Sequence, residues 1–488
     1  MQTWSTKPIQ CCLLAAGVAL SFALGAAPPS DPERAAAFAA SLSMPAVQRD
    51  LQELQALADA SGGNRAASEP GFAAAADYVQ AELAGSGLRV WRESFTFKWE
   101  QRTAELVVGG RLVDVYHAGD YTTPAGGVRG ELMLPPDGHG CTVESWGGVS
   151  LAGRVALFRP DLFEGGCWDS VKMLVAQRLG ATAAITLPSY LPAFQVTDFP
   201  MLYVRDAAAG ERLWARLAGG EQLLANVQTA YQTEPRTTFN LFAETAGEGP
   251  VIMLGAHLDS VPTGPGMDDN GSGSAVVLEV ARRADSAGFP GRLRFAWWGA
   301  EEHGLVGSTR YLESLSAADP GSLASIRAYL NADMVGSPNY VLGVYSPELT
   351  GPQPQLTQIH AALADYFPQA RVPFMTMDDD GMSDHVPFRA CGLAYGGVSS
   401  FIPGRGRVKS VDEQRLFGGT VGAPYSAHYH SANDRLENVS LQALESLGRS
   451  LAYGMARLAL DPPAAVDAAA CRLSGRTEQW RKEMATGR

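Results

Sequence analysis

The chain has 488 residues, with 38 Lys and Arg against 51 Asp and Glu, a formal net charge of −13 and 46% hydrophobic residues. This length predicts two folded domains, and the near-average apolar and charged fractions argue against a disordered or fibrous protein. The negative net charge argues against nucleic acid as a partner, because it would repel phosphates. After residue 30 no apolar run approaches the roughly 20 residues that span a bilayer, which excludes a multi-pass membrane protein.

Residues 1–27 are typical of a cleavable secretory signal. Lys7 precedes the short apolar run Cys11–Leu24, and small residues followed by Pro28 and Pro29 come after it. A membrane anchor is the alternative, but the run is short and no second stop signal follows. We therefore expect an exported protein, extracellular or periplasmic, with no stable membrane insertion once the signal is removed.

Helices and strands are expected in the first part of the mature chain. Apolar residues recur at helical spacing over 45–60, and a second helix fits 71–84. Residues 88–115 alternate apolar and polar side chains, which predicts strands. Between residues 119 and 232, Gly/Pro turn clusters separate short apolar runs around one helix at 168–179. This pattern of turns and short apolar runs predicts a smaller α/β insertion with its own core.

The remaining chain predicts an α/β domain with a mostly parallel central sheet. Val251–Ala256 and Leu293–Trp298 are nearly continuous apolar runs, as in strands that are buried on both faces. Their alternation with helices predicts a doubly wound sheet flanked by helices. The expected helices are 274–284, 305–315, 354–366 and 441–460.

Four cysteines remain after signal removal, and they allow three disulfide pairings. Cys141 and Cys167 lie in one segment, each preceded by a glycine, so a local bridge between them is our first choice. A bridge between Cys391 and Cys471 would follow only by elimination.

Two segments after the first buried strand carry candidate site residues. His257 stands at the end of that strand, where open α/β sheets form ligand sites, and Asp259 could orient its ring. Asp268 and Asp269 follow among small residues at the start of a helix. Taken alone, a loop hydrogen bond explains the first pattern and an ordinary helix N-cap explains the second.

Three further segments repeat the pattern. Glu301 and Glu302 follow the second buried strand, where two adjacent carboxylates would repel each other unless a metal took one and left the other to carry protons. A solvated turn is the simpler alternative for this pair alone. Asp333 follows another short apolar run, and Ala427–Ser431 supplies two imidazoles and a phenol. Taken together, the five segments favour a metal site.

These segments resemble the M28 family of co-catalytic zinc aminopeptidases. Five motifs occur in the family's order, and the resemblance covers roughly residues 45–115 and 235–460. The motifs are His257-Leu258-Asp259, Gly266–Gly273, Gly299–Glu302, Asp333–Ser337 and Tyr429-His430. The resemblance implies a zinc-exopeptidase-type fold and two Zn²⁺ per chain.

The resemblance also assigns roles to single residues. It places one zinc on His257 and Asp333, the other on Glu302 and His430, and Asp269 between them. Glu301 would be the general base that acts on a metal-bridging water. The remaining implied features are Asp259 as the partner of His257, Tyr429 as a donor to the tetrahedral intermediate, and a cis peptide at Asp269–Asn270.

The insertion resembles a protease-associated (PA) domain. Gly153–Leu157, Cys167 and Gln177–Ala181 follow the pattern of that domain, and the resemblance favours the Cys141–Cys167 bridge. The expected organisation is a signal peptide at 1–27, a discontinuous peptidase domain at 28–118 and 233–462, a PA-like insertion at 119–232 and a tail at 463–488.

Two departures from the family pattern concern the site. Many secreted relatives flank the Tyr-His pair with a disulfide, whereas here His428 and Asn433 stand at those positions. Relatives also often carry an arginine where this chain has Met382, so we expect a change in how the substrate is held. Arg405 or Arg407 could substitute for it.

The expected function is an exported metallo-aminopeptidase that hydrolyses N-terminal, apolar residues from peptides. The alternatives are a carboxypeptidase, a one-zinc glutaminyl cyclase, and an inactive homologue that only binds peptides. The absent arginine weakens the case for a carboxypeptidase, which must hold a terminal carboxylate. An inactive homologue would typically lack ligands, and here every expected ligand type is present.

Overall fold

The computed structural model describes residues 30–117, 119–159, 167, 169–187, 199–348, 353–379, 381–402, 408–466, 471 and 473. The expected signal peptide, Arg405, Arg407 and most of the expected tail lie outside these residues. Among the helices of the described part, none combines the length and apolar character needed to cross a membrane.

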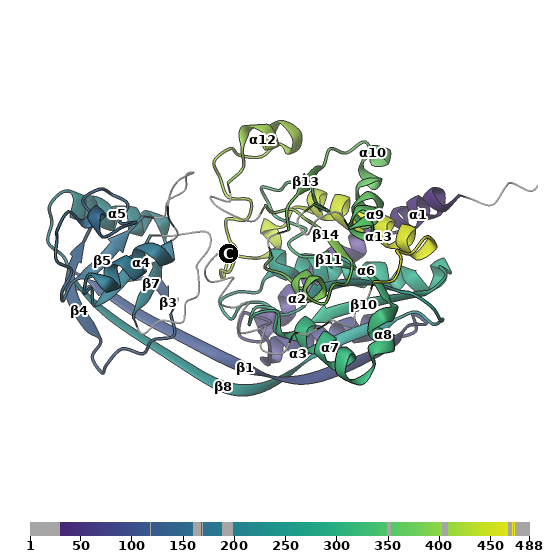
Figure 1. Ribbon diagram of the computed structural model, residues 1–488, viewed down its shortest axis with the longest axis horizontal. Coiled ribbons are helices and arrows are strands. Elements are labelled where there is room, and N and C mark those ends of the chain that lie inside the picture. The colour runs from purple at the N-terminus through teal and green to yellow at the C-terminus, as the bar shows by residue number, and fades with distance from the viewer. Residues whose placement is uncertain are drawn as a thin grey trace, which may run out of the picture.

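Two lobes are joined by a long two-stranded ribbon (Figure 1). The ribbon consists of β1 (Arg89–Val108) and β8 (Leu224–Glu244), which pair antiparallel without a break along the whole of β1. One end of β8 pairs with β10 (Arg292–Trp298) in the larger lobe, and its other end pairs with β4 (Val128–Met133) in the smaller lobe. The ribbon therefore belongs to both lobes.

The larger lobe contains the expected mostly parallel sheet. Its further strands are β9 (Val251–His257), β11 (Ile326–Ala332), β12 (Gly343–Tyr345), β13 (Met375–Met377) and β14 (Tyr395–Ser399). The spatial order is β13-β12-β14-β11-β9-β10-β8, in which β14, β11, β9 and β10 are parallel to one another. Every residue of β9 is buried, which explains its unbroken apolar sequence.

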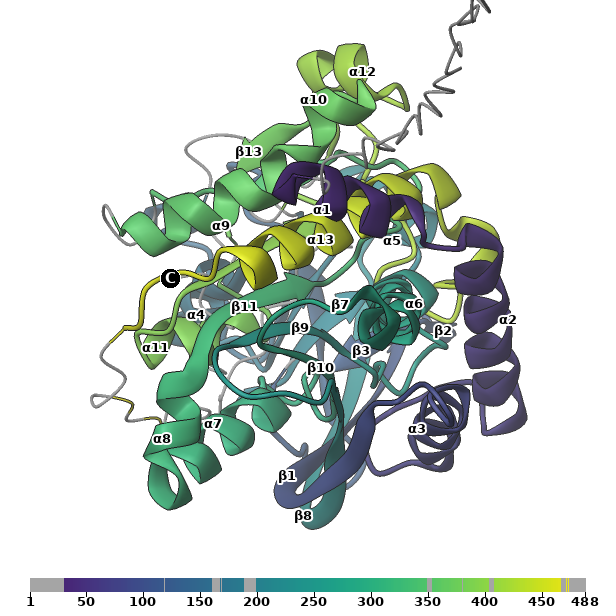
Figure 2. The same ribbon diagram turned by 90° about the vertical axis from the view of Figure 1, so that its right-hand side faces the viewer.

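The larger lobe has its own set of helices, most of which flank the sheet (Figure 2). They are α1 (Asp31–Ala40), α2 (Met44–Ala60), α3 (Pro70–Glu82), α6 (Ser272–Ala287), α7 (Val306–Ala318), α8 (Pro320–Ser325), α9 (Pro354–Ala364), α10 (Tyr366–Ala370), α11 (His385–Ala390), α12 (Val411–Phe417) and α13 (Leu441–Leu460). The sequence predicted α2, α3, α6, α7, α9 and α13, and the structure confirms them. In α13, Leu444, Leu447 and Leu451 recur at helical spacing and form a buried apolar stripe.

The smaller lobe is built around a parallel core. Its elements besides β4 are β2 (Arg111–Val113), β3 (Val115–His117), β5 (Val155–Phe158), α4 (Asp169–Arg178), β6 (Ala183–Thr186), β7 (Met201–Val204) and α5 (Ala207–Ala218). Strands β4 to β7 lie side by side and parallel, and apolar clusters separate from the larger core pack around them. The expected boundary after residue 232 falls inside β8, so the domain limits stay a prediction.

Each lobe contains a disulfide. Cys141 pairs with Cys167 in the smaller lobe, and Cys391 pairs with Cys471 in the larger one. The second bridge ties the end of α11 to the C-terminal segment. Leu473, two residues beyond, is buried in the core of the larger lobe. Part of the expected tail is therefore packed against the core.

Candidate metal centre

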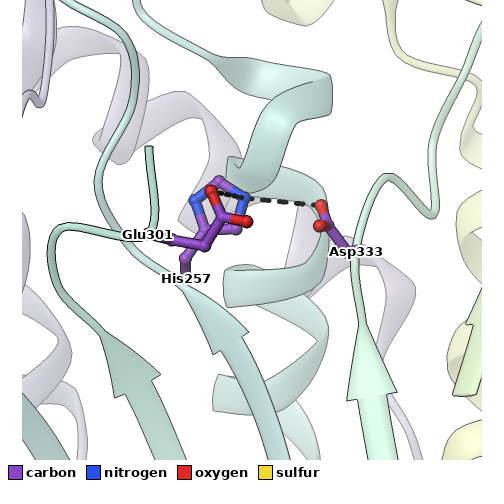
Figure 3. Close-up of side chains that lie close together, drawn as sticks. All are labelled: His257, Glu301 and Asp333. Atoms are coloured by element: carbon purple, nitrogen blue, oxygen red, sulfur yellow. Dashed lines mark ion pairs between the residues drawn. The ribbon is translucent and has the colours of Figure 1, made fainter. Parts of the chain in front are cut away.

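The candidate residues meet at the carboxyl ends of three adjacent parallel strands. His257 is the last residue of β9, Glu301 and Glu302 follow β10, and Asp333 follows β11. Figure 3 shows the side chains of His257, Glu301 and Asp333 pointing toward one another beyond the strand ends. Because parallel strands end at one edge of the sheet, residues far apart in sequence come together there.

The Asp269 carboxylate lies between two imidazoles. It comes from the segment Met267–Gly271, which precedes α6 and contains the implied cis peptide between Asp269 and Asn270. Asp269 Oδ1 lies 3.1 Å from His257 Nε2, and its Oδ2 lies 3.1 Å from His430 Nε2. Each oxygen therefore faces a different histidine.

The other two carboxylates complete the pattern. Asp333 Oδ1 lies 3.4 Å from His257 Nε2, and Glu302 Oε2 lies 3.2 Å from His430 Nε2. Glu301 is farther away, with Oε2 4.0 Å from His257 Nε2. The structure thus brings together all five residues that the sequence proposed as ligands, and it divides them into two sets that share Asp269.

This donor set fits divalent cations. Glu302 Oε1 and Asp333 Oδ1 are buried and have no hydrogen-bond partner among the described residues. Two overlapping groups of potential ligand atoms, one with Glu301 and Asp333 and one with Asp269 and Glu302, converge around His257 within 4.8 Å. Mixed imidazole and carboxylate ligands suit zinc, with manganese and cobalt as chemically reasonable substitutes.

The charges around these residues are strongly unbalanced. We call the eight carboxyl groups gathered here the acidic centre; they are Asp259, Asp268, Asp269, Glu301, Glu302, Asp333, Asp384 and Asp434. Against them stand two imidazoles and the guanidinium of Arg65. Six of the eight acids are less than a tenth exposed. Burying such an excess of negative charge is costly unless cations compensate it.

The pKa shifts express the same imbalance. Burial would lower the pKa of His257, but the charges of Glu301 and its neighbours outweigh burial and raise it well above the usual value. The pKa of His430 is about 10, because Glu302 and Asp269 outweigh burial in the same way. Burial would raise the pKa of Asp269, yet its contacts with both imidazoles lower it. Burial raises the pKa of Glu301 well above the usual value.

Asp259 holds the glutamate pair. Its Oδ1 accepts a hydrogen bond from the Glu301 N–H at 3.1 Å, and its Oδ2 accepts one from the Glu302 N–H at 3.3 Å. The sequence proposed Asp259 as the partner of His257. His257 Nδ1 lies 3.0 Å from the main-chain oxygen of Asp259 and 3.8 Å from its carboxylate. The imidazole contact therefore runs mainly through the main chain.

Tyr429 packs directly on His430. Their ring centroids are 3.8 Å apart and the planes differ by 17°. The loop that carries both residues is held without a disulfide. Arg435 forms a two-point ion pair with Asp59, at 3.0 and 2.7 Å, and the Leu436 N–H donates to Gln55 Oε1 at 2.7 Å. Contacts with α2 therefore anchor the loop.

The sequence did not identify three residues of this region. Arg65 follows a Gly-Gly-Asn break between two helices, Asp434 stands four residues after His430, and Asp384 lies at the start of α11. The one feature of the sequence that could have pointed to Arg65 is that a charged residue stands among small residues there. Near Met382, the guanidinium of Arg389 donates to Asp379 Oδ1 at 2.7 Å.

Sequence comparisons agree with these observations. The model of peptidase family M28 matches residues 240–455. The probable lipoprotein aminopeptidase LpqL of Mycobacterium tuberculosis is 33% identical over 460 residues, which cover 89% of this chain and 88% of the relative. An aminopeptidase of Pseudomonas aeruginosa is 31% identical over 458 residues, which cover 85% of this chain and 80% of the relative.

Solved structures share the fold. The aminopeptidase from Aneurinibacillus sp. strain AM-1 is 24% identical, with a TM-score of 0.61, and the match covers 88% of this chain and 97% of that one. BSAP, a zinc aminopeptidase from Bacillus subtilis, is 22% identical, with a TM-score of 0.62, and the match covers 85% of this chain and 94% of that one.

Proposed function

The chain belongs to peptidase family M28 and is a peptide hydrolase, and we propose that it is an exported, two-zinc aminopeptidase that removes apolar N-terminal residues. One observation carries the proposal. The two oxygens of the buried Asp269 carboxylate face two histidines, and each histidine has a further carboxylate beside it. This arrangement offers two similar cation sites that share one ligand. Relatives that are named aminopeptidases support the reaction class.

We assign the ligands accordingly. His257 and Asp333 would hold one ion, and Glu302 and His430 would hold the other. Asp269 would be a ligand of both ions. When bound, zinc lowers the pKa of a coordinated water and polarises the carbonyl of the peptide bond to be cleaved.

The remaining groups would move and place protons. Glu301 Oε2 lies 4.0 Å from His257 Nε2, farther than the oxygens of Asp269 and Asp333, so we take Glu301 as the carboxylate that would accept the proton of the attacking water. It would then return that proton to the leaving amine. Asp259 positions Glu301 through the main chain. Tyr429, which is stacked on His430, would donate a hydrogen bond to the oxyanion of the tetrahedral intermediate.

A substrate panel tests the proposal. We expect hydrolysis of aminoacyl anilides with apolar residues and none of their N-acetylated counterparts, because an aminopeptidase requires the free amine. Elemental analysis of the same preparation should give about two zinc ions per chain, since the donor set divides into two. Equal cleavage of the acetylated substrates, cyclisation of N-terminal Gln at one zinc per chain, or release of C-terminal residues alone would contradict the proposal.

We propose that the smaller lobe is a PA-like domain that selects substrates by length. All proposed ligands and Glu301 lie in the larger lobe, so the chemistry does not require the smaller one. A variant in which Thr103–Ala230 is replaced by a short Gly-containing turn tests this role. The turn would join Arg102 to Tyr231, which are direct partners in the ribbon.

We expect this variant to keep its zinc and to hydrolyse aminoacyl anilides within about tenfold of the wild-type kcat/KM, about 1.4 kcal/mol. Its relative rates on dipeptides and on longer peptides should change. The measurement is kcat/KM over a series of peptide lengths, with zinc content as the control for an intact centre. Loss of zinc in a folded variant would show that the lobe, or its boundary, has been assigned wrongly.

A further inference from the structure

Arg65 is a fully buried cation next to the acidic centre. Its Nε donates to the carbonyl of Leu258 at 3.2 Å, and its two terminal nitrogens donate to the carbonyls of Pro265 and Gly266, the latter at 3.1 Å. Leu258 separates His257 from Asp259, and Gly266 stands three residues before Asp269. One guanidinium therefore holds the main chain of two loops that carry proposed ligands.

Asp434 holds the same segment through its main-chain N–H groups. The N–H groups of Asp268 and Asp269 donate to its two carboxylate oxygens at 2.8 and 3.0 Å, and the Met267 N–H donates to its main-chain oxygen at 3.0 Å. Asp434 is 97% buried and belongs to the loop that carries His430. It therefore links the loop of one proposed ligand to the main chain of another.

We propose that Arg65 and Asp434 are positioning residues that clamp residues 265–269 and thereby set the metal affinity of the centre. The cation satisfies main-chain carbonyls at one end of the segment, and the anion satisfies main-chain amides at the other. The hydrogen bonds of both side chains are charge-assisted and shielded from water, which makes them strong and directional. The clamp fixes where the Asp269 carboxylate lies between the histidines. This inference rests on the proposed function, because it assumes that Asp269 binds metal.

Three variants test the clamp. Arg65→Lys keeps the charge but cannot reach three carbonyls in a fork, and Asp434→Asn keeps the shape but turns one acceptor into a donor that faces an amide. Ser260→Ala is milder, because it leaves the guanidinium in place and removes a hydroxyl that accepts from the Arg65 main-chain N–H at 2.9 Å and donates to the carbonyl of Gly264 at 3.0 Å. It supplies the Arg65 result if Arg65→Lys does not fold.

Matched controls lie away from the centre. Arg449 donates to the carbonyls of Ala39 and Leu42, so Arg449→Lys repeats the cationic change. Asp206 accepts from two consecutive N–H groups at the start of α5, so Asp206→Asn repeats the anionic one. Zinc dissociation constants are measured by chelator competition, beside the unfolding midpoint of each zinc-free protein.

We expect Arg65→Lys and Asp434→Asn each to weaken zinc binding about 10- to 100-fold, the usual effect of losing a group that orients a ligand. Ser260→Ala should weaken it less, and the controls should bind as the wild type does. The double variant should lose less than the product of the single losses, because both residues hold one segment. With zinc in large excess, kcat should recover in the single variants.

The outcomes separate the two hypotheses. A wild-type protein that binds no zinc would overturn the proposed function. A wild type that binds two ions, with Asp434→Asn and the Arg65 or Ser260 variant binding them equally well, would overturn the clamp alone. A fall in the zinc-free unfolding midpoint without any change in zinc affinity would show that these residues only stabilise the fold, and would also overturn it.

Discussion

Glu301→Gln should retain about two zinc ions and lose roughly two to four orders of magnitude in turnover, the range expected for general acid–base catalysis. The amide is nearly isosteric with the carboxylate, so the Asp259 contact with the main-chain N–H of residue 301 is unaffected. It cannot accept and return a proton at neutral pH. KM should change little, because the variant loses an interaction that acts in the transition state.

Glu302→Gln is the matched comparison, because the two glutamates are adjacent and held by the two oxygens of one carboxylate. Glu302 Oε2 lies beside His430, so its loss removes an anionic ligand and should lower zinc occupancy together with rate. Glu313→Gln on α7 controls for the substitution itself. If Glu301→Gln lost zinc while Glu302→Gln kept both ions, the two roles would be exchanged.

Complete removal of metal should abolish activity, and added zinc or cobalt should restore it. The acidic centre offers imidazole and carboxylate donors, whereas the sequence shows no serine or cysteine nucleophile motif and the four cysteines outside the expected signal peptide form disulfides. Magnesium should restore little, because it prefers all-oxygen ligation and retains its waters.

The measurement is turnover of an apolar aminoacyl anilide before chelation, after chelation and dialysis, and after addition of each ion, with metal content followed by elemental analysis. Dialysis without chelator is the control for loss of protein. Full activity in a preparation shown to contain no transition metal would rule out metal-dependent hydrolysis.

The sequence was most informative where local pattern and chemistry coincide. The apolar runs at Val251–Ala256 and Leu293–Trp298 predicted β9 and β10, because strands buried on both faces have no polar alternation. Polar residues at the ends of such strands then predicted a common site. Three of the five proposed ligands, His257, Glu302 and Asp333, lie together because parallel strands end at one edge. Asp269, in the segment before α6, and His430, in a later loop, reach the same place through contacts that the strand pattern does not predict.

The sequence was least informative where a role depends on main-chain contacts between distant segments. Arg65 carries no motif, and its partners are carbonyl oxygens about 200 residues later in the chain, which any residue could supply. The carboxylate of Asp259 likewise reaches main-chain N–H groups after β10, which spacing alone does not reveal. The extent of the ribbon was not predicted either, since alternation predicts a strand but not its partner.

The continuous ribbon also bears on the order of folding. Its inner end joins Arg89 to Glu244, which are 155 residues apart in sequence. Closing a flexible loop of that length costs about 4.5 kcal/mol of chain entropy by the logarithmic relation. A smaller lobe that has already folded holds Val108 beside Ala225, so the other pairs can close one after another from that end. A smaller lobe that folds first would thus shorten the search by which the larger lobe assembles, although none of the proposed ligands belongs to it.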